Sequence, residues 1–223
     1  MPIDYTKNRR PQAAQGTGVS LTKVTLTKNS PTVSLSKQQG GSAGGELRVN
    51  LNWTSRPASG GLFKRMAAAD IDLDLGCLYE FTNGRKGVVQ ALGNSFTSRN
   101  DGAPIISLDG DDRTGQSAEG ENLRIDLSRL REVRRILVFT YIYEGTPNWA
   151  GANAIVTLYP QGGAPIEIHL DEADPGSRTC AIALLESTGT DLSVRREVQY
   201  INGTQSALDA AYSWGMSWTK GRK

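Results

Sequence analysis

The sequence predicts an all-β protein, a β-sandwich of two mainly antiparallel sheets with one short C-terminal helix. Short segments rich in β-branched and aromatic residues alternate apolar with polar positions, and turns containing Gly, Pro, Asn or Asp separate them. Only residues 204–214 place apolar side chains at helical spacing. About ten short strands with almost no helix are typical of a sandwich. The 223 residues suffice for one such domain with its own core.

The expected elements follow in order along the chain. Residues 1–16 mix charged residues with Pro, Gln and Gly without periodicity, which predicts a flexible tail before a single domain of residues 17–223. Residues 83–87, NGRKG, form a hairpin-type turn, and residues 134–145 are apolar on both faces, as in a central strand. We expect strands in residues 18–28, 32–37, 46–53, 70–81, 87–92, 122–130, 134–145, 154–160, 165–172, 178–187 and 193–201.

Several residue types limit the possible functions. His169 is the only histidine, so neither a Cys–His zinc site nor a His-dependent catalytic triad is expected. Cys77 and Cys180 lie far apart within apolar runs, which favours buried thiols over a disulfide or a metal pair. No apolar run approaches the roughly 18–20 residues that span a bilayer, and the N-terminus lacks the apolar core of a secretory signal. We therefore expect a cytoplasmic protein.

Charge is unevenly distributed along the chain. Between Asp70 and Asp126 there are eleven acidic side chains and five basic ones, whereas both ends of the chain are basic. A nucleic-acid-binding domain would show a basic stripe through its folded part, so no nucleic acid is expected. The acidic middle favours a cation instead. The basic N-terminal tail is either simply solvated or binds an anionic surface electrostatically.

The stretch DIDLDLG, residues 70–76, places an acidic residue at every second position of an expected strand. Asp70, Asp72 and Asp74 then share one face, about 6.5–7 Å apart, while the intervening apolar residues face the core. Two explanations remain open. The acidic face is either solvated, or it supplies oxygen ligands to a divalent cation that offsets the repulsion between the carboxylates.

The remaining ligands would come from residues 107–123, which we expect to form a long loop dense in Asp, Glu, Thr, Asn and Gly. Oxygen donors without sulfur favour Ca²⁺ over a transition metal. An EF-hand is excluded, because Leu75 and Phe81 would occupy the positions that require Gly and Glu. The alternative is an ordinary turn whose Asp side chains bind backbone amides.

Several motifs in order resemble the tellurium-resistance TerD family. They are GVSLTK near the start, DIDLDLG, DGDDRTG followed by GENLRIDL, and NWAGANAIV. Within that family, DLDLGCLYE, KGVVQALGN, ILVFTYIYEG, CAIALLE and AYSWGMSW are similar to the TerA-like branch. The resemblance covers residues 17–220, nearly the whole chain.

The resemblance implies a β-sandwich that binds Ca²⁺. It implies no specific enzymatic activity. The family's DLD motif falls on residues 72–74 and its Asp-Asn-x-Thr-Gly loop on residues 111–115, with Asp112 where Asn is usual. The resemblance also implies that the protein functions together with other tellurite-resistance and stress-response proteins. These include membrane proteins and proteins with a von Willebrand A-type domain. The metal ligands expected on this basis are Asp70, Asp72, Asp74, Asp111, Asp112, Thr114, Glu119 and Glu121.

Two other functions compete with a non-catalytic calcium-binding module. A hydrolase could use paired carboxylates as acid and base, but these carboxylates lie among glycines and not in an apolar pocket that raises a carboxyl pKa. A binder of a small polar ligand, a sugar or a nucleotide, could use an ion-bridged loop site. Its surface would be Asn148, Trp149 and Asn153, with Trp149 expected in an exposed loop, whereas Trp53 is expected in the core.

Overall fold

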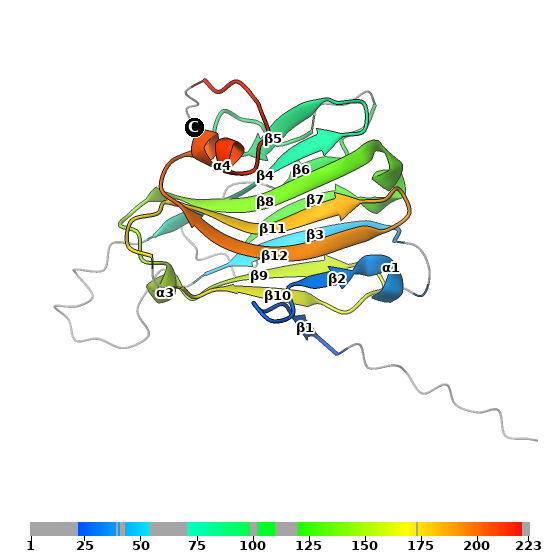
Figure 1. The fold of residues 1–223 in the computed structure, drawn as a ribbon, viewed down its shortest axis with the longest axis horizontal. Helices are drawn as coiled ribbons and strands as arrows, with labels where there is room; N and C mark the ends of the chain where they lie inside the picture. The colour runs from blue at the N-terminus through cyan, green and yellow to red at the C-terminus, as the bar shows by residue number, and fades with distance from the viewer. Residues whose placement is uncertain are drawn as a thin grey trace, which may run out of the picture.

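The computed structural model describes residues 22–38, 40, 43–53, 71–98, 102–109, 120–172 and 174–219. Two six-stranded sheets pack face to face, which confirms the expected all-β sandwich (Figure 1). The expected tail, residues 1–16, lies outside the residues that the structure describes. In the described part of the chain, no helix is long and apolar enough to cross a membrane.

The first sheet has the strand order β1-β10-β9-β3-β7-β6. Its neighbouring strands are antiparallel, except that β1 pairs with β10 in parallel. Its strands are β1 (Val24–Thr25), β3 (Glu46–Asn52), β6 (Ile106–Leu108), β7 (Glu121–Asp126), β9 (Ala154–Pro160) and β10 (Ile166–Leu170).

The second sheet has the order β2-β12-β11-β8-β4-β5, and all its neighbouring strands are antiparallel. The long strand β8 lies between β4 and β11, which confirms a central strand where both faces are apolar. The strands are β2 (Thr32–Ser34), β4 (Asp72–Phe81), β5 (Lys86–Gln90), β8 (Val133–Glu144), β11 (Thr179–Ser187) and β12 (Leu192–Ile201).

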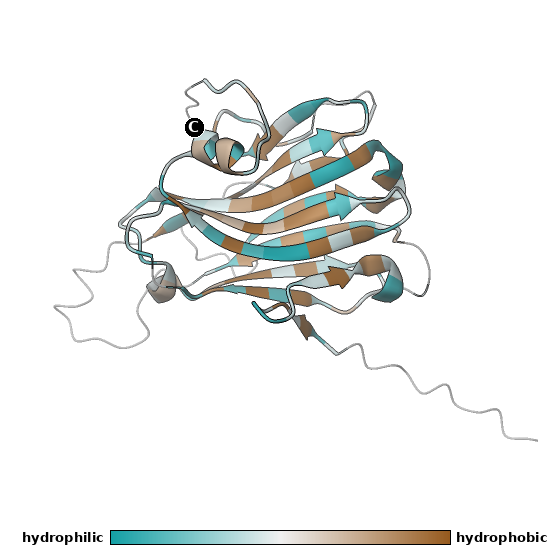
Figure 2. Cartoon of the chain, in the orientation of Figure 1, coloured by the Kyte–Doolittle hydropathy of each residue, from teal (hydrophilic) through white to brown (hydrophobic). Residues whose placement is uncertain are grey.

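The main core lies between the two sheets, where the inward side chains of both interdigitate. Trp53 is buried in this core, as expected from the alternation in β3. Cys77 and Cys180 are also buried there as free thiols, which confirms that they form no disulfide. Figure 2 shows the apolar residues running along β8 and β11, whereas β12 carries a hydrophilic stretch.

A second, smaller apolar cluster covers the outer face of the second sheet. Helix α4 (Gln205–Ala211) and the segment 212–219, which we call the C-terminal strap, lie over β4, β5 and β8 (Figure 1). Trp214 of the strap is fully buried against Leu78 and Phe139. Helix α4 confirms the single longer helix expected in residues 204–214.

Three short helical segments lie where we expected a strand or a loop from the sequence. They are α1 (Leu35–Gln38), η1 (Leu127–Glu132) and α3 (Trp149–Ala152). Side chains that bind backbone amides explain where these turns begin. The carboxylate of Asp126 accepts a hydrogen bond from the amide of Ser128 at 2.9 Å, and that of Asp191 accepts one from Ser36 at 2.9 Å. The strand expected in residues 122–130 therefore ends at Asp126.

Candidate functional site

The strand that carries the acidic repeat, β4, is buried along its whole length. Leu73 and Leu75 face the main core, as expected from the alternation. Asp74 lies on the opposite face of β4, the face that also carries Leu78, and it has no exposed surface. Asp72 is only 7 % exposed. The solvated acidic face that the sequence left open is therefore excluded for these two carboxylates.

Neighbouring side chains and the register with β8 explain how Asp74 is enclosed. Asp74 lies opposite Tyr141, and Gly76 lies opposite Phe139. A Cβ atom at Gly76 would approach the ring of Phe139 to 2.8 Å, so the absence of a side chain at Gly76 makes room for this ring. Trp53 donates its indole N–H to the carbonyl of Ile71 at 3.0 Å and so fixes the chain just before β4.

Glu121 joins the end of the second acidic segment to β4. Its Oε2 accepts a hydrogen bond of 2.6 Å from the backbone N–H of Leu75, and Glu121 itself is only 3 % exposed. Strand β5 ends at Gln90, which lies opposite Gly76, so the carboxylate binds β4 just beyond its last pairing with β5. Such a hydrogen bond to an ionised acceptor is short and strong.

Gly120 allows the chain to enter β7 at this point. Its φ is +60°, and a Cβ atom there would collide with the backbone carbonyl oxygen of Leu51. Only glycine satisfies both conditions without strain. The glycine therefore sets the position of Glu121, the residue that follows it.

The predicted metal ligands divide into two groups. Asp72, Asp74 and Glu121 lie at one end of the sandwich, where β4 begins beside the start of β7. Among the residues that the structure describes, no three His, Cys, Asp or Glu side chains gather closely enough to hold a metal ion. The other predicted ligands, Asp70, Asp111, Asp112, Thr114 and Glu119, lie outside those residues.

The three described carboxylates nevertheless fit the chemistry of a calcium site. All their donor atoms are oxygens, and Ca²⁺ takes six to eight of these. Burying carboxylates costs free energy unless hydrogen bonds or a cation compensate the charge. Asp74 and Glu121 are buried at this end of the sandwich, and both lie next to Leu75. Further oxygens would have to come from beyond the described residues.

The structure corrects the expected position of Trp149. This residue begins helix α3 and is 1 % exposed, so the expectation of an exposed indole in a loop is wrong. Its ring packs at 5.3 Å from that of Tyr200, and its N–H donates to the carbonyl of Ser177 at 2.8 Å. The burial follows from a local cap, because Asn148 accepts a hydrogen bond from Gly151 and turns the chain into α3.

Asn148 and Asn153 remain on the surface, at either end of α3. Asn153 has a φ of +46°, a left-handed conformation that Asn tolerates better than most residues. Without the Trp149 ring, these two residues offer no aromatic face for a ligand. The predicted ligand surface at residues 148–153 thus loses its main element.

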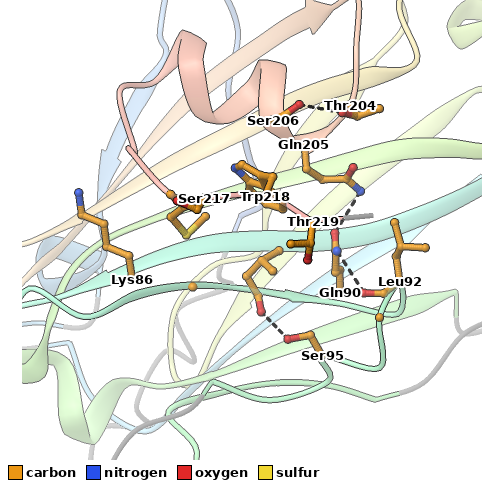
Figure 3. Close-up of a pocket in the computed structure, with 14 residues that line it drawn as sticks. Lys86, Gln90, Leu92, Ser95, Thr204, Gln205, Ser206, Ser217, Trp218 and Thr219 are labelled. Carbon is orange, nitrogen blue, oxygen red and sulfur yellow. Dashed lines mark hydrogen bonds between the residues drawn. The ribbon is translucent and has the colours of Figure 1, made fainter. Parts of the chain in front are cut away.

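A pocket that the sequence did not suggest lies on the outer face of the second sheet. Its volume is about 920 Å³, and β5, the turn after β5, the start of α4 and the C-terminal strap surround it (Figure 3). Lys86, Gln90, Gln205 and Trp218 are among its lining residues. The one signal in the sequence was the spacing of two tryptophans in AYSWGMSW: Trp214 is buried, whereas Trp218 is half-buried and lines the pocket.

Comparison with known proteins gives one curated relative. No family model matches the chain. This chain is 42 % identical over 207 residues to the "Tellurium resistance protein TerA" of an Alcaligenes species. The alignment covers 92 % of this chain. The chain spans only 60 % of the length of that relative. This similarity confirms the resemblance to the tellurium-resistance proteins that the motifs indicated.

Solved structures share the fold at lower identity. A homologue of the telluride resistance protein TerD from Streptomyces coelicolor superposes with a TM-score of 0.53 at 20 % identity, covering 74 % of this chain and 95 % of the other. A protein of unknown function superposes with a TM-score of 0.54 at 16 % identity, covering 72 % of this chain and 92 % of the other. At these identities the likeness concerns the fold alone.

Proposed function

We infer, from the 42 % identity to a tellurium resistance protein TerA, that this chain works in a tellurite-resistance system. Within that system we propose that it is a calcium-binding, non-catalytic interaction module. The observation that carries the proposal is the burial of Asp72, Asp74 and Glu121 at one end of the sandwich. Three buried carboxylates from two sheets indicate a structural need for negative oxygens there.

In this proposal Asp72 and Asp74 from β4 and Glu121 from β7 contribute ligands to Ca²⁺ jointly with oxygens of residues 111–119. They do not act as a three-carboxylate cluster, because in the described residues these side chains do not gather closely enough for that. The bound ion neutralises carboxylates that would otherwise repel one another. The amide of Leu75 keeps the Glu121 carboxylate in place through its 2.6 Å hydrogen bond. Calcium would thus join the two acidic segments and shape the surface that they present.

The environments of the two cysteines and the histidine support a non-catalytic role for these three side chains. Burial raises the pKa of both thiols, at Cys77 and at Cys180, so neither forms a thiolate readily. His169 lies partly exposed on β10 with its Nε2 3.5 Å from a carboxylate oxygen of Glu167. Among the residues that the structure describes, no serine or cysteine side chain forms a hydrogen bond with His169.

The partners that we propose are other tellurite-resistance and stress-response proteins in the cytoplasm. The similarity to a protein named "Tellurium resistance protein TerA" supports this choice. The calcium-ordered end of the sandwich is the surface that we assign to them.

Calorimetric titration of Ca²⁺ into chelator-treated protein tests the proposal. We expect saturable binding to the unmodified protein, and binding weaker by about tenfold or more in Asp74→Asn and Glu121→Gln, because each removes one negative charge from the site. Two variants on different strands guard against a fold defect in either one. Circular dichroism of each variant confirms its sheet content.

Matched control variants remove equal charge elsewhere. Asp171→Asn changes an exposed carboxylate just after β10, and Glu186→Gln changes an exposed one at the opposite end of the second sheet. Both controls should bind Ca²⁺ as the unmodified protein does. Absence of calcium binding by the unmodified protein, or unchanged affinity in both site variants, contradicts the proposal.

A further inference from the structure

The pocket on the outer face of the second sheet has a distinct floor, wall and roof. Outward-facing residues of β5, among them Lys86, Val88 and Gln90, form the floor. The turn that carries Ser95 and the start of α4 form the walls, while residues 216–219 of the C-terminal strap form the roof (Figure 3). The pocket is therefore built by residues 86–95 together with residues 204–219, two parts of the chain far apart in the sequence.

Hydrogen bonds fix the walls of the pocket. The buried amides of Gln90 and Gln205 join the floor to α4, because Gln205 Nε2 donates to Gln90 Oε1 at 3.1 Å. Gln90 Nε2 donates in turn to the carbonyl of Leu92 at 3.1 Å. Ser95 Oγ donates to the carbonyl of Val88 at 2.8 Å. These contacts, drawn in Figure 3, hold the site in shape before any ligand arrives.

The strap is fixed over the pocket in the same way. Asp209 of α4 accepts hydrogen bonds from Met216 N and Trp218 Nε1, both at 3.0 Å. Lys86 Nζ donates to the carbonyl of Trp214 at 2.6 Å. The Trp218 indole is thereby held with part of its surface available, whereas the neighbouring Trp214 is buried.

The lining combines neutral polar groups with an apolar face. Seven of the fourteen lining residues carry a hydroxyl or an amide, and none carries a carboxylate. The one charged lining residue, Lys86, already donates to a backbone carbonyl. Val88, Leu92, Met216 and Trp218 supply the apolar part. Ser217 and Thr219 are exposed at the rim.

This chemistry selects the class of ligand. Tight binding of a metal cation is favoured by carboxylates, which the lining lacks, and binding of an anion by several donors that carry positive charge, of which the lining has one. Hydroxyls and amides both donate and accept, so they match ligand groups that do the same. A ligand with many hydroxyls and a partly apolar ring face satisfies both kinds of surface. At about 920 Å³ the pocket lies near the upper end of ligand-site volumes and exceeds a single sugar ring.

We propose that this pocket binds a neutral oligosaccharide of two or three sugar units, with Trp218 stacking on a sugar ring and the hydroxyls of Ser217 and Thr219 binding ligand hydroxyls. The site is separate from the acidic end of β4 and β7. Its function does not depend on calcium. The Gln90–Gln205 pair positions the floor against α4.

Saturation-transfer NMR with cellobiose, maltotriose and N,N′-diacetylchitobiose tests the proposal. We expect saturation transfer to at least one of these saccharides, and none to glucose 6-phosphate, inorganic phosphate or choline. Trp218→Ala should weaken the binding by about tenfold, the equivalent of one lost stacking contact. The double variant Ser217→Ala, Thr219→Ala changes only exposed side chains and should weaken it by about threefold.

The controls separate loss of the site from loss of the fold. Tyr159→Ala removes an exposed aromatic side chain from β9 of the other sheet and should leave saccharide binding unchanged. Asp74→Asn should also leave it unchanged, because the proposed calcium site is elsewhere. The proposal is overturned if none of the three saccharides binds at millimolar concentration. It is equally overturned if the double variant binds as tightly as the unmodified protein.

Discussion

At the scale of single residues, the carboxylate of Glu80 in the second sheet stabilises the strap indirectly, through an arginine that contacts Trp214. Its side chain is 4 % exposed, and its two oxygens accept hydrogen bonds from Arg134 at 2.8 Å and from Arg135 at 2.7 Å. The guanidinium of Arg135 also stacks on the ring of Trp214 at 3.9 Å. Glu80 thus anchors an arginine whose other face supports a buried tryptophan of the strap.

The pKa of Glu80 gives this arrangement a measurable pH dependence. Burial alone would raise the pKa, but the hydrogen bond and charge of Arg135, with Lys86 and Arg134, outweigh it and lower the pKa below its ordinary 4.5. A lowered folded-state pKa adds stability above the ordinary value, and this contribution is lost as the pH falls below 4.5 toward the folded-state pKa.

We therefore expect Glu80→Gln to lower the free energy of unfolding at pH 7 by about 2 kcal/mol. The difference from the unmodified protein should shrink as the pH falls below 4.5. Urea unfolding at a series of pH values measures this difference. The control is Glu132→Gln, which removes a partly exposed pair with Arg129 and should cost less than about 1 kcal/mol. A pH-independent cost for Glu80→Gln would contradict the account.

At the scale of elements, the C-terminal strap depends on one buried carboxylate of α4. Asp209 is 6 % exposed and accepts hydrogen bonds from Gly215 N at 2.8 Å, from Met216 N and from the Trp218 indole. Trp214 has its own anchor, an N–H donated to the carbonyl of Tyr79 at 3.2 Å. The part of the strap beyond Trp214 is therefore the part that Asp209 holds.

We expect Asp209→Ala to release this part and to speed amide exchange of residues 215–218 by about tenfold or more, because the charged acceptor is worth about 1.5–3 kcal/mol. Hydrogen-exchange mass spectrometry measures it. Asp174→Ala is a matched control, since Asp174 also accepts hydrogen bonds from two backbone amides, those of Gly176 and Ser177. If the amides of residues 215–218 exchange at the same rate in Asp209→Ala as in the unmodified protein, contacts other than those of Asp209 hold this part of the strap.

Elements also show what the sequence could and could not predict. The alternation in β3 and β4 correctly predicted which residues enter the core, because a strand places successive side chains on opposite faces. The same alternation could not tell whether Asp72 and Asp74 are solvated, since burial of the outer face depends on segments distant in sequence. The expectation for Trp149 failed because a local Asn148 cap turns a loop-like sequence into a helix.

The pocket was not predictable for a related reason. It arises where β5, α4 and the strap meet, and no local pattern in any of the three indicates the others. The short strand β6 was missed because it is only three residues long and precedes an acidic segment. Contacts between distant segments, and not local propensity, decide both features.

At the scale of the whole molecule, the sandwich brings two acidic segments together that are separate in the sequence. β4 belongs to the second sheet and β7 to the first, so face-to-face packing of the sheets is what places Glu121 against Leu75. A cation held by both segments would link the two sheets at this end. Binding to the folded state alone would then stabilise the whole domain.

The free energy of unfolding, measured by urea titration with and without Ca²⁺, tests the calcium site most directly. At a hundredfold excess of Ca²⁺ over its dissociation constant, we expect the free energy of unfolding to rise by about 2.7 kcal/mol for the unmodified protein and for Asp171→Asn. Asp74→Asn and Glu121→Gln should gain much less. Identical unfolding curves with and without Ca²⁺ for the unmodified protein would contradict the central claim.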